Sequence, residues 1–204
     1  MRAIRAASRS LFGGVCALIS QLWLDILISA VGLLTVTFYT WALRAHFSSK
    51  TVPRGTVVIS LTVSAITLWY LALTWLLEPP LLATLAGFVL QLAGLGLFWS
   101  AIRASRAARL RLAFDLENPD TLVREGPYRF VRHPFYTSYI IFWSAWALAI
   151  WSVWALPPLI AIITIYVIAA RDEERKFSRT AMAQAYDDYR TTTGFFWPRL
   201  GAGK

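Results

Sequence analysis

Long apolar tracts constrain this chain more than any other feature of its sequence. Four tracts, at residues 11–43, 56–77, 81–102 and 135–170, contain almost no charged side chains. Each reaches or exceeds the roughly 20 apolar residues that a helix needs to cross a bilayer. Hydrophobic residues make up 57% of the chain and charged residues only 15%, whereas soluble domains have about 45–50% and about 25%. We therefore expect an all-α polytopic membrane protein.

The first tract is too long for one ordinary span. Arg2, Arg5 and Arg9 precede it at helical spacing. This pattern predicts an interfacial helix at about 2–19, followed by a first span at about 21–43. A cleaved signal peptide is the alternative, although no A-x-A cleavage pattern follows the basic start.

The two middle tracts each predict a single span. Glu78-Pro79-Pro80 lies between them and predicts a tight turn, because proline is tolerated where the next helix opens. Gly87 and Gly94, with Ala83, are small residues that allow a neighbouring helix to pack closely against the third span.

The last tract would be about 54 Å long as one helix, which exceeds a hydrocarbon core of about 30 Å. Trp151 and Trp154, followed by Pro157-Pro158, lie near its middle and suit a turn at the water interface. The tract therefore predicts two short spans, at about 135–151 and 154–171, and five spans in all.

The distribution of Lys and Arg supports five spans. The N-terminal segment carries 3, the loop at 44–55 carries 3, the loop at 103–134 carries 7, and the tail from residue 171 carries 7. With five spans, both loops and the tail share one side and hold 17 of the 20 basic residues. The positive-inside rule then predicts an outside N-terminus and a cytoplasmic C-terminus. The basic charge thus indicates membrane orientation, and we expect no nucleic-acid partner.

The tail beyond the last span predicts an amphipathic cytoplasmic helix. Phe177, Ala181, Ala185 and Tyr189 recur every four residues, and charged residues occupy the other faces. We expect this helix to lie on the membrane or fold over the bundle, with its tyrosines serving mainly in packing.

Two polar clusters are expected to meet at the cytoplasmic end of the bundle. One is the segment 122–136, which leads into the fourth span, and the other is the segment 171–176, which leads out of the fifth. A hairpin between these spans would bring the clusters together. His133 precedes Pro134, which biases it away from helix and places its ring at the mouth of the bundle.

The clusters contain groups of complementary chemistry. Tyr128 and Tyr136 offer aromatic faces to a nucleobase or a cation. Glu173 and Glu174 can bind an ammonium or lie near a sulfonium. Arg171, Arg129 and Arg132 can bind a carboxylate. These groups together suit S-adenosylmethionine. The alternative is that the arginines contact anionic lipid head groups and that the tyrosines belong to an interfacial aromatic belt.

The run Gly-Pro-Tyr-Arg-Phe-Val-Arg-His-Pro-Phe-Tyr at 126–136, followed by a short apolar hairpin and the pair Glu173-Glu174, resembles the isoprenylcysteine carboxyl methyltransferase family. Phospholipid N-methyltransferases belong to the same wider group of integral membrane methyltransferases. The resemblance covers roughly residues 120–200. The region at 1–102, with the interfacial helix and the first three spans, has no family-specific feature, and the resemblance implies a cofactor-binding region at 103–204.

The resemblance also implies roles for individual residues. The residues implied to bind S-adenosylmethionine are Leu122, Val123, Tyr128, His133, Pro134, Tyr136, Glu173 and Glu174. The residues implied in catalysis are Arg171, Glu174 and His133, and no metal is implied. The acceptor would be a lipophilic molecule that enters from the bilayer.

The chain departs from the carboxyl methyltransferases at one position. In those enzymes an arginine lies about one helical turn before the acidic pair, whereas this chain has Ala169 there and its nearest arginine is Arg171. Two residues turn a helical side chain by about 200°. An amine, thiol or hydroxyl acceptor therefore stays open beside a carboxylate. An amine or thiol would need a base, for which His133 and Glu174 are the candidates.

Two other classes of protein remain as alternatives. Membrane sterol reductases resemble the Arg-His-Pro-x-Tyr pattern at 132–136 and use a nicotinamide cofactor. A non-catalytic membrane protein, such as a small carrier, would be expected to place polar residues or broken helices at mid-bilayer. The sequence specifies neither the acceptor nor the oligomeric state.

Overall fold

The computed structural model describes residues 2–46, 54–107 and 122–199, and this part of the chain is almost entirely helical. Two short 3₁₀ helices, Gly126–Arg129 (η1) and Val153–Ala155 (η2), flank α4. The α-helices are α1 (Arg2–His46), α2 (Arg54–Leu76), α3 (Leu81–Ala107), α4 (Pro134–Ile150), α5 (Leu156–Phe177) and α6 (Ala183–Thr192).

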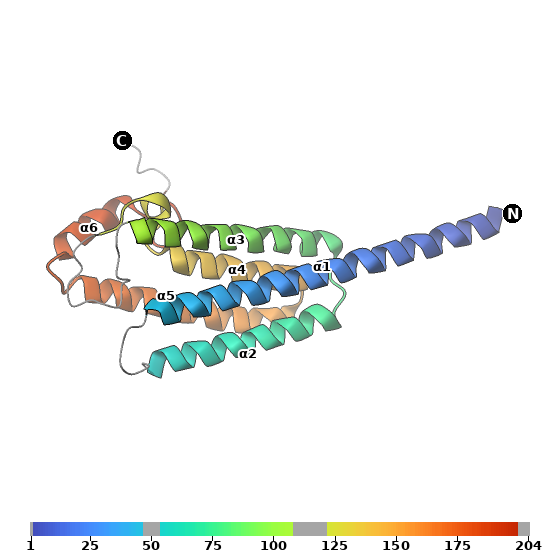
Figure 1. The fold of residues 1–204 in the computed structure, drawn as a ribbon, viewed down its shortest axis with the longest axis horizontal. Coiled ribbons are helices and arrows are strands. Elements are labelled where there is room, and N and C mark those ends of the chain that lie inside the picture. The colour runs from blue at the N-terminus through green and yellow to red at the C-terminus, as the bar shows by residue number, and fades with distance from the viewer. Residues whose placement is uncertain (1, 47–53, 108–121, 200–204) are drawn as a thin grey trace.

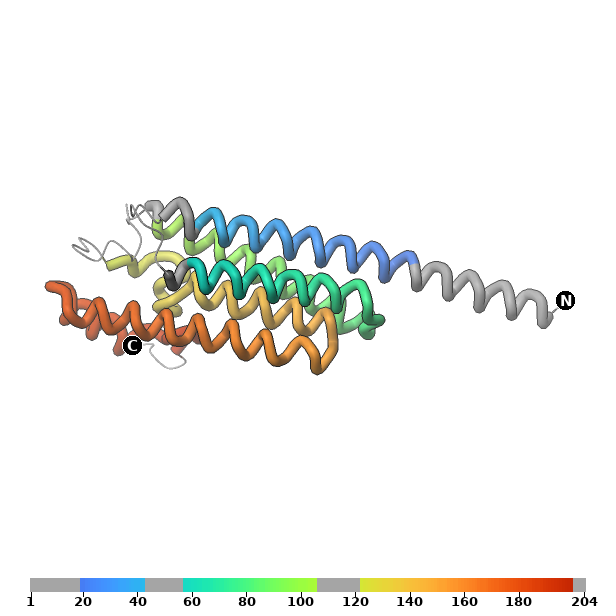
Figure 2. Tube along the Cα trace, turned by 90° about the horizontal axis from the view of Figure 1, so that it is seen from below, coloured from blue at the N-terminus to red at the C-terminus, as the bar shows by residue number. Residues whose placement is uncertain are grey.

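Helices α1 to α5 lie side by side with their long axes nearly aligned, as both views show (Figure 1, Figure 2). The α2–α3 turn and the α4–α5 turn lie at one end of this bundle, which we name the turn end. Helix α6 and the segment 122–133 lie at the opposite end, which we name the α6 end. The predicted hairpin therefore brings the two polar clusters to the same end.

Four helical segments are long and apolar enough to cross a membrane: Ile19–Ala42, Val57–Leu76, Leu81–Ser105 and Val153–Phe177. Helix α4 has 17 residues, about 25 Å at 1.5 Å per residue. The sequence predicts five spans, and the structure has five bundle helices of which α4 is the shortest. The all-α polytopic architecture is confirmed.

Helix α4 is the centre of the bundle and packs most closely against α3. A Cβ atom added to Gly87 would lie 2.6 Å from the carbonyl oxygen of Ala145, and one added to Gly94 would lie 3.2 Å from that of Ser138. The two backbones can approach so closely because these residues lack side chains. The predicted role of Gly87 and Gly94 in packing is confirmed.

A cluster of aromatic side chains from α1 to α5 fills the interior of the bundle around α4. Trp143 and Trp146 are fully buried and lie with their rings 6.0 Å apart and nearly parallel. The indole of Trp146 donates to Thr74 Oγ1 at 3.1 Å, and that of Trp143 donates to the Tyr166 hydroxyl at 3.1 Å. The buried indole N–H groups thus have partners, as burial in an apolar core requires.

The α4–α5 turn confirms the predicted split of the last apolar tract. Helix α4 ends where Trp151 adopts a left-handed conformation with φ of 50°. Pro157 and Pro158 occupy the first turn of α5, where the missing N–H of proline would have no helical partner in any case. The turn itself is tied to α2, because Tyr70 donates to the carbonyl of Ala155 at 2.8 Å and Trp69 to that of Trp154 at 3.0 Å.

Two details of the predicted helices are wrong. The sequence predicts separate helices at 2–19 and 21–43, but α1 is continuous from Arg2 to His46, and no proline within this range forces a break. The stripe from Phe177 to Tyr189 predicts one tail helix. Instead α5 continues to Phe177, a turn covers 178–182, and α6 begins at Ala183.

Candidate active site

The two polar clusters meet where α4 begins and α5 ends. His133 is the N-cap of α4, with φ of −122° and ψ of 63°, and Pro134 fills the first helical position. His133 thus lies outside the helix, as the sequence predicts, and only 7% of it is exposed. The predicted convergence of His133 with the acidic pair is present in the structure.

Both imidazole nitrogens of His133 face a carboxylate. Nε2 lies 3.2 Å from Glu174 Oε1, and Nδ1 lies 3.8 Å from Glu173 Oε2. The rings of Phe195 and Tyr136 flank the imidazole at centroid distances of 4.9 and 5.8 Å. The histidine is therefore fixed in orientation by charge on two sides and by aromatic rings on others.

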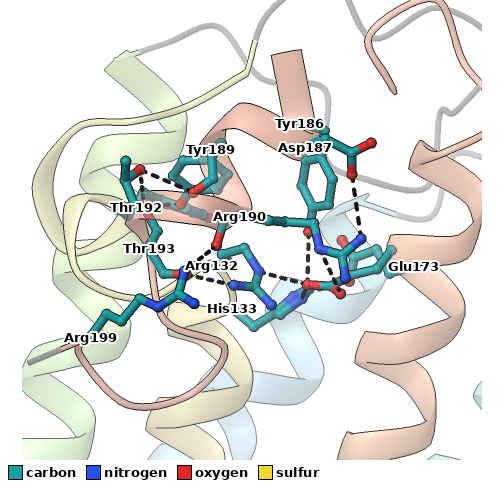
Figure 3. Close-up of polar contacts among 12 residues, drawn as sticks. Arg132, His133, Glu173, Tyr186, Asp187, Tyr189, Arg190, Thr192, Thr193 and Arg199 are labelled. Carbon is teal, nitrogen blue, oxygen red and sulfur yellow. Dashed lines mark hydrogen bonds and ion pairs between the residues drawn. The ribbon is translucent and has the colours of Figure 1, made fainter. Parts of the chain in front are cut away.

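Glu174 is the centre of the polar network, and its two oxygens differ sharply. Oε1 accepts from Arg132 Nε at 2.7 Å, from the Tyr186 hydroxyl at 3.0 Å and from His133 Nε2 at 3.2 Å. Within the described part of the chain, Oε2 has one contact, an ion pair with Arg190 Nε at 3.8 Å. Figure 3 shows the side chains of Arg132, His133, Tyr186 and Arg190 close together, with dashed lines for the polar contacts of this network. Since Oε1 is saturated, Oε2 is the oxygen with acceptor capacity to spare.

An open pocket of about 520 Å³ adjoins Glu174. Its lining residues are Arg171, Glu174, Arg175, Ser178, Arg190 and Phe195. Small-molecule sites usually occupy about 300–1,000 Å³, so the pocket has an appropriate size. Arg171 is exposed and contributes to this lining, so the structure brings it beside Glu174 as the sequence predicts.

The segment 193–199, which we name the strap, lies across His133. Gly194 pairs with Val131 in a parallel β-bridge, in which Arg132 N–H donates to the Gly194 carbonyl at 2.8 Å and Gly194 N–H donates to the Phe130 carbonyl at 3.2 Å. A side chain at Gly194 would collide with the backbone carbonyl of Trp197. The sequence analysis did not find the strap, although Gly194 beside two phenylalanines gave a signal for a close backbone approach.

Helix α6 contributes directly to the network, so the prediction that its tyrosines serve mainly in packing is wrong for Tyr186. Its ring stacks on Phe177 with centroids 4.9 Å apart, and its hydroxyl binds Glu174. Tyr189 donates to the Tyr128 carbonyl at 2.6 Å. Burial raises the pKa of Tyr189 to about 12, and burial with the negative charge of Glu174 raises the pKa of Tyr186 further. Both hydroxyls therefore remain donors at neutral pH.

The other predicted cofactor residues lie around this network rather than in the pocket lining. Tyr128 is half-buried, and burial together with the nearby charge of Glu173 raises its pKa. Val123 is buried and Leu122 half-buried. The neighbouring Arg124 ties this segment to α6 by donating to the Ala185 carbonyl at 2.8 Å. This bond and the one from Tyr189 to the Tyr128 carbonyl hold the segment beside α6.

Arg132 is the main residue whose role the sequence analysis did not identify. The sequence offered carboxylate binding or head-group contact for the arginines of this segment, whereas the structure buries Arg132 to 10% side-chain exposure and pairs it with Glu174. Its position next to His133 in the same motif was the available signal. Arg129, in contrast, is exposed and lies over the ring of Phe130.

Comparison with known protein families finds a match that covers the site. The sequence profile described as phospholipid methyltransferase matches residues 82–188. The matched range includes α3 from its second residue, all of α4 and α5, and the first part of α6. It therefore contains both His133 and Glu174. No curated protein and no solved structure matches this chain.

Proposed function

Because the chain belongs to the phospholipid methyltransferase family, a family of membrane methyltransferases, we propose that it transfers a methyl group from S-adenosylmethionine to a lipophilic acceptor. The single observation that carries this proposal is the asymmetry of Glu174. Three protein donors hold Oε1, while Oε2 keeps its acceptor capacity beside a pocket that also contains Arg171.

The donor set of the pocket fits the amino-acid end of S-adenosylmethionine. That end carries an ammonium and a carboxylate, which need an anion and a cation close together. Glu174 and Arg171 both line the pocket and supply this pair. The ring of Phe195 adds an apolar wall, so the lining is both charged and aromatic.

The remaining residues would enclose the other end of the cofactor. We assign backbone contacts to Leu122 and Val123, and aromatic contacts to Tyr128 and Tyr136. This assignment is supported by the aromatic and acidic surroundings of His133, which touches Tyr136 and both glutamates. Pro134 has the further role of ending the loop and starting α4 immediately after His133.

The residues of this chain contribute mainly alignment and exclusion of water. S-adenosylmethionine supplies an already activated methyl group, so the acceptor needs to be held in line with it and kept dry. Arg132, Tyr186 and His133 fix Glu174, which in turn orients the pocket. The strap covers His133 with the rings of Phe195 and Phe196 and so keeps water from the imidazole.

A general base is needed only for some kinds of methyl acceptor. A carboxylate has no proton to lose, whereas an amine or thiol does. Glu174 is a weak base because Oε1 already accepts three hydrogen bonds. In the tautomer whose Nε2 donates to Glu174 Oε1, His133 would offer Nδ1 to the proton of the methyl acceptor. Glu173, 3.8 Å away, then stabilises the resulting imidazolium.

The bias of basic residues supports a cytoplasmic location for the α6 end. Seventeen of the 20 Lys and Arg residues belong to the two loops and the tail that five crossings place on one side. The acceptor would then come from the bilayer and S-adenosylmethionine from the cytoplasm.

Calorimetric binding of S-adenosylmethionine to the detergent-purified protein tests the proposal, with NADPH as a competitor. We expect saturable binding that His133→Ala and Glu174→Gln each weaken by at least about 10-fold. Asp172→Asn is the matched control, because Asp172 is an exposed neighbour that pairs only with Arg175 among its described contacts. No binding to folded wild-type protein, or displacement by NADPH, would refute the assignment.

A further inference from the structure

Arg132 connects two parts of the site that are otherwise separate. Its Nε donates to Glu174 Oε1 at 2.7 Å, and its Nη1 donates to the Thr193 carbonyl at 2.5 Å. Its guanidinium also lies 5.4 Å from the ring centroid of Phe195. One side chain thus touches the central carboxylate of the network and two residues of the strap.

We propose that Arg132 is a positioning residue that couples the strap to Glu174, so that closure of the strap over His133 fixes the orientation of the carboxylate. This inference rests on the proposed function, in which Glu174 Oε2 binds the ammonium of S-adenosylmethionine. Arg132 itself faces Oε1 and does not line the pocket. It therefore acts on the cofactor through Glu174.

The geometry of the guanidinium explains why the coupling is specific. A guanidinium is planar, and its N–H groups form a rigid fork, so two partners bound by it are fixed relative to each other. Glu174 lies in the last turn of α5 and Thr193 follows α6, and Arg132 reaches both from the loop before α4. If the strap shifts, the fork shifts with it and the donor on Oε1 is withdrawn.

The low exposure of the pair strengthens the coupling. The side chains of Arg132 and Glu174 are 10% and 12% exposed. Removing one member of a buried charge pair leaves the other uncompensated, which costs far more than breaking a surface pair. The Arg132–Glu174 contact is therefore expected to have a measurable effect on the pocket.

Arg124 provides a matched control from the same loop. It also donates to a backbone carbonyl of the C-terminal region, that of Ala185 at 2.8 Å, and its guanidinium lies 5.7 Å from the ring centroid of Tyr189. It has no contact with Glu174 among the described residues. Arg124→Ala therefore removes a tether of similar chemistry while leaving the carboxylate untouched.

The first experiment measures the dissociation constant of S-adenosylmethionine for the full-length variants in detergent. We expect Arg132→Ala to raise it about 10- to 100-fold and Arg124→Ala to raise it less than about 2-fold. Arg132→Lys keeps the charge but not the fork, so it should stay within about 5-fold of wild type. Equal effects of the two alanine variants would overturn the proposal.

A double-mutant cycle tests whether Arg132 acts through Glu174. In the Glu174→Gln background, Arg132→Ala should weaken binding by less than about 2-fold, because the carboxylate that it orients is gone. If the two substitutions multiply, Arg132 contributes independently of Glu174 and the positioning role is wrong. Arg132→Lys in place of alanine keeps the cycle usable if the alanine variant fails to fold.

Hydrogen exchange of the strap gives a readout that needs no cofactor. The amide of Gly194 bonds to the Phe130 carbonyl, so its exchange reports whether the strap is closed. We expect Arg132→Ala, Arg132→Lys and Glu174→Gln each to speed exchange at Gly194 by about 5-fold or more, and Arg124→Ala to leave it unchanged. Lack of cofactor binding with this exchange pattern intact would refute the proposed function alone, whereas a closed strap in Arg132→Ala would refute the coupling.

Discussion

The two ends of the bundle use polar side chains in opposite ways. At the turn end, Tyr70 and Trp69 donate to the carbonyls of Ala155 and Trp154, and Trp146 donates to Thr74. Each of these bonds joins a neutral donor to one acceptor. At the α6 end, Arg132 and His133 from the loop before α4 and Arg190 from α6 converge on the carboxylate of Glu174.

The two ends differ in how much hydrogen-bonding capacity their polar groups retain once their bonds within the protein are made. At the turn end, the hydroxyl and indole donors bond to carbonyl or hydroxyl oxygens, and each such group would be costly to bury without a partner. At the α6 end, Glu174 Oε2 has a single ion pair, with Arg190, among the described residues, and both Glu174 and Arg171 line an open pocket. We therefore expect substitutions at the turn end to alter stability, and substitutions at the α6 end to alter binding and turnover.

The largest effect on stability is expected for Trp146→Ala. The side chain is fully buried, stacks on Trp143 and bonds Thr74, so its removal should lower the free energy of unfolding by about 3–5 kcal/mol. Denaturant titration in micelles measures this loss. Trp154→Ala, at a ring that is 64% exposed, should change it by less than about 1 kcal/mol. Comparable losses in both variants would contradict the packing that we describe.

At the α6 end, Glu174→Gln should reduce turnover about 100-fold. The amide cannot pair with Arg132 and Arg190, and it cannot supply an anionic Oε2 to the pocket. A methyl-transfer assay with radiolabelled S-adenosylmethionine, run with an added lipid extract as acceptor, gives the rate. Asp172→Asn, at an exposed residue two positions before Glu174, should retain full activity. A fully active Glu174→Gln enzyme would remove Glu174 from the site.

The contrast between the ends also explains how much of the molecule could be predicted from sequence. Helix positions follow from apolar length and proline placement, which are local properties, and the turn between 150 and 156 was predicted for this reason. The convergence of His133 with Glu173 and Glu174 followed from the same argument, since a hairpin returns its two ends to one place.

The parts that could not be predicted depend on contacts between distant backbones. The strap is held by bonds between residues about 60 positions apart, such as Arg132 with Gly194, and no periodic pattern encodes them. Tyr186 enters the site because the turn at 178–182 folds α6 back beside α5. If the tail were one continuous helix, as predicted, Tyr186 would lie elsewhere and would not reach Glu174.

A smaller effect is expected for Tyr186→Phe. The change removes one of three donors to Glu174 Oε1 but keeps the ring that stacks on Phe177. S-adenosylmethionine should therefore bind about 3- to 10-fold more weakly. Because burial and the charge of Glu174 raise the pKa of Tyr186, its hydroxyl stays protonated, and the ratio of wild-type to variant affinity should be constant between about pH 6 and 9. A ratio that changes across this range would show that the hydroxyl titrates.

The smallest effect is expected for Tyr70→Phe, which makes the same substitution at the turn end. Tyr70→Phe also removes one buried hydroxyl donor, here from the Ala155 carbonyl, and should lower the free energy of unfolding by about 1 kcal/mol. The affinity for S-adenosylmethionine should stay within about 1.5-fold of wild type, since Tyr70 lies on α2 at the turn end and the loss of one neutral bond there leaves no ligand group misplaced. If Tyr70→Phe weakened binding as much as Tyr186→Phe, the two ends would be energetically coupled through α4, and the division between a structural and a functional end would fail.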